Sequence, residues 1–219
     1  AIIWTWVATG TLDFTSGGIL ADKIDPTMLP VLLALYMFGI GKAALMPFHR
    51  WLPSAMVAPT PVSALLHAVA VVKAGVFTVL KVAIYIFGIE TLSTTGASEW
   101  LMWVAAFTLL TASLVAMTKD NLKARLAYST ISQLAYIVLA VAVANQLSVI
   151  GGALHIATHA VGKITLFMCA GAIYVATHKT EISDMRGLGR AMPFTFAAFF
   201  IGAISIIGLP PMGGTWSKW

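Results

Sequence analysis

The chain has 219 residues, of which 59% are hydrophobic and 10% are charged, and its mean hydropathy is +0.92. Soluble domains carry about 25% charged residues, so this composition excludes an ordinary soluble protein and indicates a polytopic membrane protein in a lipid bilayer. The formal net charge of +5 is expected from basic loops on the cytoplasmic side, and nothing in it supports nucleic-acid binding. The single cysteine, Cys169, excludes an internal disulfide.

Both ends of the sequence lie at apolar stretches. The chain opens on "AIIWTWVATG", without a starting Met or a charged n-region, and closes on "GGTWSKW" directly after an apolar run. We therefore expect an internal fragment of a longer protein, and the lack of a signal peptide carries no weight.

Apolar runs long enough to cross a bilayer, which takes about 20 residues, recur along the whole chain. They predict an all-α fold with a partial helix over 1–10 and then spans over 28–58, 61–87, 100–117, 127–145, 149–176 and one beginning near 191. The loops between these spans alternate in charge. Segments 11–27 and 88–99 are mainly acidic, whereas 118–125 and 178–190 are mainly basic.

The charge alternation bears on how often the first long segment crosses the membrane. The positive-inside rule places the basic loops in the cytoplasm and the acidic loops outside if 28–58 crosses once, with "MPFHRWLP" inside the crossing. Alternatively, 28–46 is a full span followed by an interfacial segment over 47–60. In the first case a helix is broken at membrane depth, where its freed backbone groups must be buried in protein or line a hydrated cavity.

A second segment near the end follows the same plan. In "IIGLPPMGGTWSK" an apolar helix is followed by two prolines, two glycines, a tryptophan and a lysine. Transporters place such discontinuous helices at their ion sites. The helix-breaking residues that we single out are Pro47, Pro53, Pro210 and Pro211.

Several basic residues fall inside the predicted spans, whereas all eight acidic residues fall in the loops. A charge at mid-membrane costs about 3 kcal/mol or more, so each such residue is a candidate functional group. Lys42 either extends its amine to the membrane surface from a helix end or exchanges protons beside the break. His67 is a core histidine or a relay residue, and Lys73 lies too deep in its span to reach the surface easily.

The most informative stretch is "LHIATHAVGKITLF". His155, His159 and Lys163 recur every fourth residue, which places them on one helix face. The stripe either seals two helices together or forms a file of proton-exchanging groups, as a proton relay requires. A metal site is disfavoured because no carboxylate or thiolate accompanies the histidines. Hydroxyl and amide side chains in the preceding span, Ser129 among them, serve as packing contacts or support water along such a relay.

Four ordered motifs resemble one membrane protein family. "GKAALMPFHRWLPSAMVAPTPVSALLHAVAVVKAG", "DNLKARLAYSTISQLAYIVLA", "LHIATHAVGKITLF" and "GLPPMGGTWSK" are similar to the antiporter-like subunits L, M and N of respiratory complex I and to the Mrp-type Na+/H+ antiporter subunits. The segments "FHRWLP" and "TWSKW" are most similar to the D-type protein of the Mrp antiporter. The A-type protein and the quinone-oxidoreductase subunits follow in similarity.

The resemblance implies a fold with about fourteen transmembrane helices and two inverted repeats, each containing one broken helix. Residues 1–219 would form a single transmembrane domain, with 1–87 ending the first repeat and 100–219 forming most of the second. By the same resemblance the proton relay consists of Lys42, His67, Lys73, His155, His159, Lys163 and Lys218. Ser54 stands where many relatives have Asp, and the glutamate that pairs with the first lysine would precede residue 1.

The sequence therefore predicts a proton-translocating subunit of a multisubunit complex in the bacterial cytoplasmic membrane. The first hypothesis is an Mrp-type Na+/H+ antiporter, and the alternative is a proton-pumping subunit of an NADH-quinone oxidoreductase. Because Na+ prefers oxygen ligands and the spans hold no acid, this segment suits protons better than Na+. We find no nucleophile with a partnered base, no cofactor motif and no metal cluster, so we expect no catalytic site of its own. A structural subunit whose polar residues only pack is a further alternative.

Overall fold

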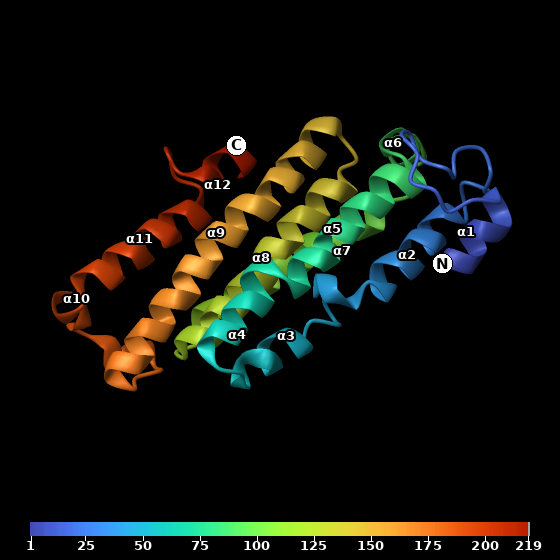
Figure 1. Ribbon diagram of the computed structural model, residues 1–219. Coiled ribbons are helices and arrows are strands. Elements are labelled where there is room, and N and C mark those ends of the chain that lie inside the picture. Colours follow the sequence, from blue (N-terminus) through green and yellow to red (C-terminus); the bar gives the residue numbers. More distant parts are fainter. Residues whose placement is uncertain (219) are drawn as a thin grey trace.

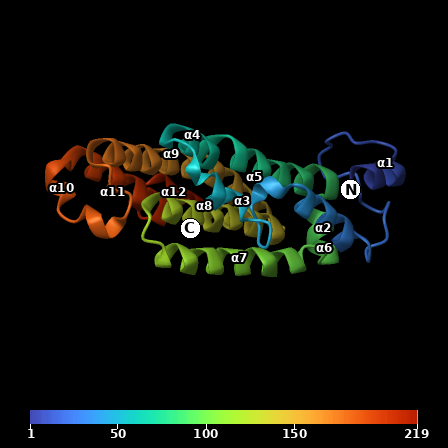
Figure 2. The same ribbon diagram turned by 90° about the horizontal axis from the view of Figure 1, so that it is seen from below.

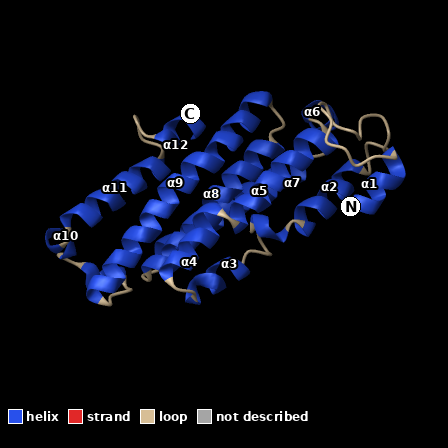
Figure 3. Cartoon of the chain, viewed as in Figure 1, coloured by secondary structure: helices blue, strands red, loops and turns tan. Residues whose placement is uncertain are grey.

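Long apolar helices make up most of residues 1–218, the part of the chain that the computed structural model describes (Figure 1). The α-helices are α1 (Ile2–Thr9), α2 (Leu29–Gly39), α3 (Trp51–Ser54), α4 (Thr60–Ala64), α5 (Val71–Lys81), α6 (Ile89–Thr95), α7 (Glu99–Thr118), α8 (Leu122–Ala142), α9 (Gln146–Thr177), α10 (Leu188–Ala191), α11 (Pro193–Ile207) and α12 (Gly213–Lys218). Short 3-10 turns occur at η1 (Gly41–Ala43), η2 (Ala55–Val57) and η5 (Ile182–Met185). No strand is formed within these residues, as Figure 3 shows.

Four helical segments are long and apolar enough to cross a membrane. They are Thr60–Phe87, Glu99–Thr118, Leu122–Ala142 and Gln146–Thr177. The first runs without a gap through α4, the π-helix η3 (Leu65–Val69), α5 and the π-helix η4 (Val82–Phe87). Figure 2 shows α7 along the outside of the bundle, against α8. The all-α, multi-pass membrane architecture is thus the one that the sequence predicts.

The boundaries of one span differ from the sequence expectation. The sequence predicts a span over 127–145, whereas α8 begins five residues earlier, at Leu122. The basic residues Lys123 and Arg125 give this first turn the composition of a loop. The side chain of Asn121 caps the helix by accepting a hydrogen bond from the Ala124 N–H at 3.1 Å, which satisfies one of the free donors at the helix start.

Two spans are interrupted. After α2 and the turn η1, the chain is non-helical or turned from Ala44 to Arg50 before α3 begins. Pro47 lies in this interruption, whereas Pro53 lies after it, in the first turn of α3, where a proline costs no helical hydrogen bond. The second interruption separates α11 from α12 and contains both Pro210 and Pro211.

The interrupted first span passes once from one end of the bundle to the other. At its start, the N–H of Ile19 donates to the Ile86 carbonyl at 3.0 Å, so segment 11–27 lies beside the end of the Thr60–Phe87 helix. At its far end, Lys123 Nζ donates to the Ala58 carbonyl at 3.5 Å, beside the start of α8. Acidic loops 11–27 and 88–99 therefore lie at one end of the bundle and basic loops 118–125 and 178–190 at the other (Figure 1).

The two basic loops are fastened to each other. Asn121 and Glu181 form an isolated antiparallel bridge, and the Ser183 hydroxyl donates to the Asp120 carboxylate at 2.6 Å. The Ser183 N–H donates to the same carboxylate at 3.2 Å. These contacts tie the start of α8 to the segment that follows α9.

The contact between Asp120 and Ser183 is expected to weaken in acid. The Ser183 hydroxyl is the main cause that holds the pKa of Asp120 below its ordinary value of 3.8. A carboxyl whose folded pKa is depressed contributes stability above its ordinary pKa and loses it as the pH falls through the folded value. We expect hydrogen-exchange protection of the Ser183 amide, corrected for intrinsic rates, to fall only below pH 3.8. In Asp120→Asn the protection should be lower at neutral pH and nearly constant across that range; a wild-type protein with no such change would contradict this role.

Candidate functional site

A group of ionisable side chains is buried in the middle of the bundle. Four of the sequence candidates are at most 3% exposed, and a fifth is 6% exposed: His67 (0%), Lys163 (0%), His159 (2%), His155 (3%) and Lys73 (6%). They come from the Thr60–Phe87 helix and from α9, which pack against each other. We call these five residues the buried file.

The face of α9 that carries three file residues is set by its sequence. His155, His159 and Lys163 follow one another at four-residue spacing, so they lie one above the other along the helix. The helix begins at a capping box: the Asn145 side chain accepts from the Ser148 backbone N–H, and the Ser148 side chain accepts from the Asn145 backbone N–H. With 32 residues it is the longest of the described helices and extends through the whole bundle.

The two helices are joined by a contact between Lys73 and His159. Lys73 Nζ on α5 is hydrogen-bonded to Nδ1 of His159 on α9. His67 lies one and a half turns before Lys73, in the π-helical turn η3, and its ring stacks on Phe167 at a centroid distance of 5.4 Å. Single π-helical turns widen a helix locally and are frequent at functional sites.

Lys163 is held by α8. Its Nζ donates to the Ser129 hydroxyl at 2.9 Å and to the Leu126 carbonyl at 3.1 Å. The side chain is fully buried, and both partners are neutral. The amine is therefore in a position where gain or loss of a proton is not balanced by a fixed carboxylate, so its charge depends on the neighbouring groups of the file.

The file continues into the second interrupted span. His155 Nδ1 lies 2.9 Å from the hydroxyl of Ser217 on α12. The next residue, Lys218, donates to the Ile206 carbonyl at 2.6 Å and lies 5.0 Å from the centroid of the Tyr136 ring. The rings of His155 and His159 are 5.7 Å apart between centroids. Lys73, His159, His155 and α12 are thus linked by consecutive neighbours.

Lys42 is placed differently from the other candidates. It is exposed on η1 and lines a groove of about 700 Å³ together with Pro47, Phe48, Trp51 and neighbouring residues. The backbone of Lys42 lies directly on Gly75 of α5, two residues from Lys73. The first interruption is therefore packed against the helix that carries Lys73, although the Lys42 amine itself is outside the buried file.

Several nitrogen atoms of the file have no hydrogen-bond partner among the described residues. They are both ring nitrogens of His67 and the Nε2 atoms of His155 and His159. A buried polar atom without a partner is costly, so such atoms are retained where they have a chemical role. Imidazoles and amines in series, each able to accept and release a proton, form an arrangement suited to proton transfer.

Three contacts of the file were not predicted from the sequence. Ser217 matches no sequence pattern, Ser129 is one of several hydroxyls on its helix, and the Leu126 carbonyl has no sequence signal. Both serines occupy ordinary helical positions, and only tertiary packing shows that they contact the file. Within residues 1–218 no three His, Cys, Asp or Glu side chains gather as a metal site would require.

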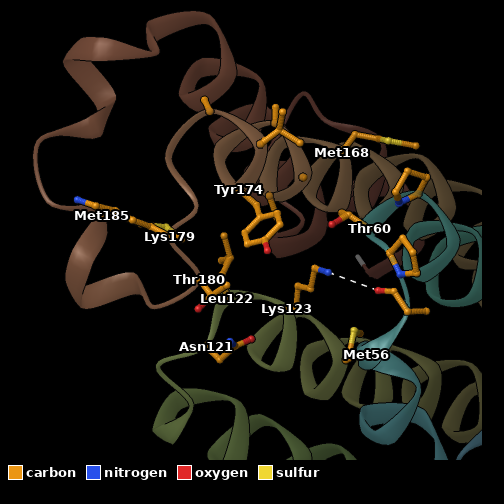
Figure 4. Close-up of a pocket in the computed structure, with 18 of the residues that line it drawn as sticks. Met56, Thr60, Asn121, Leu122, Lys123, Met168, Tyr174, Lys179, Thr180 and Met185 are labelled. Atoms are coloured by element: carbon orange, nitrogen blue, oxygen red, sulfur yellow. Dashed lines mark hydrogen bonds between the residues drawn. The ribbon is translucent and has the colours of Figure 1, made fainter.

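A larger groove of about 1120 Å³ lies at the basic end of the bundle, between the start of α4, the start of α8 and the end of α9 (Figure 4). Lys123 and Tyr174 face each other across it. Leu122 and Ala170 line it and belong to an apolar cluster with Leu126, Leu166 and Phe167. Since Leu126 and Phe167 also contact Lys163 and His67, this cluster lies between the groove and the file.

Comparison with known proteins identifies the family. The chain is 37% identical over 233 residues to NAD(P)H-quinone oxidoreductase chain 5 of Synechocystis sp., covering 99% of this chain and 33% of the relative. It is 37% identical over 201 residues to NADH-quinone oxidoreductase subunit L of Rickettsia bellii, covering 91% of this chain and 30% of that one. The chain thus spans about a third of the length of these curated relatives.

Two solved structures have the same fold. The Mrp complex from Dietzia sp. matches with a TM-score of 0.85 and 35% identity, over 99% of this chain and 24% of that one. The membrane-bound sulfane sulfur reductase, an archaeal respiratory membrane complex, matches with a TM-score of 0.84 and 34% identity, over 98% and 44%. The family model described as "NADH:quinone oxidoreductase/Mrp antiporter, TM" matches residues 1–219 in full. The chain belongs to this family of transmembrane segments.

Proposed function

We propose that this chain is the proton-translocating part of an antiporter-like subunit in a multisubunit membrane complex. The observation that carries the proposal is the buried file, in which Lys73 of one helix is hydrogen-bonded to His159 of another and no described carboxylate pairs with the buried lysines and histidines. All eight acidic residues lie in loops, in short connecting helices or, for Glu99, at the first residue of α7. A file that only sealed two helices together would be more stable if built from apolar or paired groups.

The proposed route follows the sequence hypothesis. Protons enter near Lys42 at the first interruption, pass His67 and Lys73, cross through the α9 residues and leave near Lys218 at the second interruption. Support for this order comes from the packing of the first interruption on Gly75 and from the contact of α12 with His155. Each proton that arrives changes the charge felt by the next group, which couples the steps.

The driving force separates two candidate assemblies. We propose an Mrp-type Na+/H+ antiporter in the bacterial cytoplasmic membrane, where other membrane subunits would complete the complex and hold any Na+ site. The likeness to the Mrp complex structure supports this reading. The second candidate is a redox-driven pump, favoured by the curated relatives, which are named quinone oxidoreductase subunits. Division of the chain into 1–87, the end of a first inverted repeat, and 100–219, most of a second, is part of the same proposal.

Reconstitution of the complex that contains this protein tests the proposed function and distinguishes the Na+/H+ antiporter from the redox-driven pump. The purified complex is placed in vesicles with a pH-sensitive dye and is supplied either with a Na+ gradient or with an electron donor and quinone. Proton movement driven by Na+ supports antiport, and movement driven by electron transfer supports the redox pump. No proton movement with either driving force would refute the proposed function.

Lys42→Ala is expected to lower proton transport per assembled complex by about a hundredfold, the lower end of the loss that follows removal of a proton-transfer group. Lys42 is exposed, so its truncation should leave assembly unchanged. Lys23→Ala is the matched control, because Lys23 is also exposed but lies in loop 11–27, where its amine donates to the Thr9 carbonyl. Transport at the control level in Lys42→Ala would remove Lys42 from the route.

A further inference from the structure

We propose that the Ser217 hydroxyl carries protons between His155 and the second interruption, and that it fixes which nitrogen of His155 holds the proton. This inference rests on the proposed function of the buried file. Ser217 lies on α12, directly before Lys218, and its Oγ is 2.9 Å from His155 Nδ1. No other described side chain is hydrogen-bonded to the His155 ring.

The hydrogen bonds of Ser217 determine the direction of its contact with His155. The hydroxyl donates its single proton to the Gly214 carbonyl at 3.1 Å, an oxygen that can only accept. With the hydroxyl proton directed at Gly214, the same oxygen accepts at its contact with His155, and in this arrangement Nδ1 of His155 carries a proton. In the neutral ring Nε2 then has a free lone pair, and this atom is buried without a partner.

His159 is fixed in the opposite sense. An ammonium group has donors only, so charged Lys73 donates to Nδ1 of His159, and the proton of the neutral ring lies on Nε2. That Nε2–H is also buried without a partner. The two neighbouring rings, 5.7 Å apart between centroids, therefore present complementary atoms: a donor on His159 and an acceptor on His155.

This polarity accounts for the part of the proposed route that runs from Lys73 to Lys218. Lys73 passes a proton to Nδ1 of His159, which releases its Nε2 proton to Nε2 of His155, directly or through water. His155 then releases its Nδ1 proton to Ser217 Oγ, and Ser217 turns its own hydroxyl proton away from Gly214 toward a neutral Lys218. Each histidine and the serine gain one proton and lose one, so one proton moves from Lys73 to Lys218. Both rings are left in the opposite tautomer, and each must return to its starting form before the next proton follows.

The second interruption holds Ser217 in place. A Cβ on Gly214 would overlap the Ser205 carbonyl oxygen, so α12 can approach α11 this closely only with glycine at that position. Across from it, a Cβ on Gly151 of α9 would lie 3.4 Å from the Ser217 carbonyl. The short helix is thus packed between α9 and α11, and this packing brings its hydroxyl to His155.

The experiment measures proton transport per assembled complex in vesicles for two substitutions of Ser217. Ser217→Ala should lower transport at least about tenfold, because the hydroxyl that receives the His155 proton is lost. Ser217→Thr keeps the hydroxyl and should restore transport to within about threefold of wild type. The matched control is Thr215→Ala, which removes a hydroxyl of the same helix that donates only to the Gly208 carbonyl, and which should lie within about twofold.

A second measurement reports the tautomer directly. In the complex labelled with ¹⁵N-histidine, the His155 signals, identified by their loss in His155→Ala, should show the Nδ1–H form in wild type. In Ser217→Ala this form should no longer dominate. A wild-type Nε2–H tautomer, or equal losses of transport in Ser217→Ala and Thr215→Ala, would overturn the inference. If Ser217→Ala and Lys163→Met both leave transport intact, the proposed function itself fails. If Lys163→Met loses transport and Ser217→Ala does not, only the role of Ser217 is rejected.

Discussion

Lys163→Met is expected to lower proton transport by the assembled complex at least about a hundredfold, which is the lower end of the loss that follows removal of a proton-transfer group. Methionine has nearly the length and shape of lysine without its amine. Because Lys163 is fully buried, the substitution keeps the packing between α8 and α9 and removes only the group that holds the proton. Lys163→Ala should lose transport equally but assemble less well, since it leaves a cavity.

The partners of Lys163 make this substitution easy to interpret. The Leu126 carbonyl that accepts from Lys163 also accepts from the Thr130 hydroxyl at 2.9 Å, so it keeps a partner in the variant. Ser129 loses one contact of a neutral hydroxyl. We therefore expect assembly, measured as complex recovered with its other subunits, to remain near wild type in Lys163→Met.

Lys81→Met is the matched control for Lys163→Met. Lys81 belongs to the Thr60–Phe87 helix, but it is partly exposed and its amine lies 4.4 Å from the Phe14 ring centroid, outside the file. Transport should stay within about twofold of wild type in this control. If Lys163→Met reduced assembly while leaving transport per complex intact, the buried file would only pack helices together, and the protein would have a structural role in its complex.

Gly75→Ala is expected to destabilise the complex by about 3 kcal/mol, the upper end for an overpacked site, and to reduce transport with it. A Cβ at this position would lie 2.5 Å from the Lys42 carbonyl carbon and 2.7 Å from the Ala43 nitrogen. These are backbone atoms, which cannot move aside as a flexible side chain would. The first interruption must therefore shift away from α5, and with it the entry to the proposed route.

The control for Gly75→Ala uses another glycine of the same region. Gly39 is the last residue of α2, and a Cβ there would meet no atom within 4 Å. Gly39→Ala should therefore be neutral or slightly stabilising, since alanine favours a helix by about 1 kcal/mol over glycine. Thermal unfolding of the solubilised complex measures both variants; an unchanged midpoint in Gly75→Ala would show that the interruption is not seated on α5 as described.

The two glycine contacts explain how a broken helix stays ordered in this protein. Each interruption is packed backbone to backbone against a neighbouring helix, the first on Gly75 and the second through Gly214. Freed backbone groups of a broken span need partners inside the protein. One such partner is the Thr108 hydroxyl on α7, which accepts from the Met46 N–H at 3.2 Å.

The sequence by itself determined the class of fold, the spans and most of the buried ionisable residues. Continuous apolar runs need no tertiary information, because a helix of about 20 such residues is stable only in a bilayer or a core. The spacing of His155, His159 and Lys163 fixes a shared face in the same way, since a helix repeats every 3.6 residues. The sequence also separated the acidic loops from the basic ones.

Only the tertiary structure decided which of these residues meet. Contacts of Lys73 with His159 and of His155 with Ser217 join residues 86 and 62 positions apart, and no local pattern encodes them. Lys42 illustrates the opposite outcome, because it is a lysine beside an interrupted span as Lys218 is, yet its side chain is exposed. The physical reason is that helix packing depends on the shapes of both partners, so periodicity places a side chain on a face without saying what that face will contact.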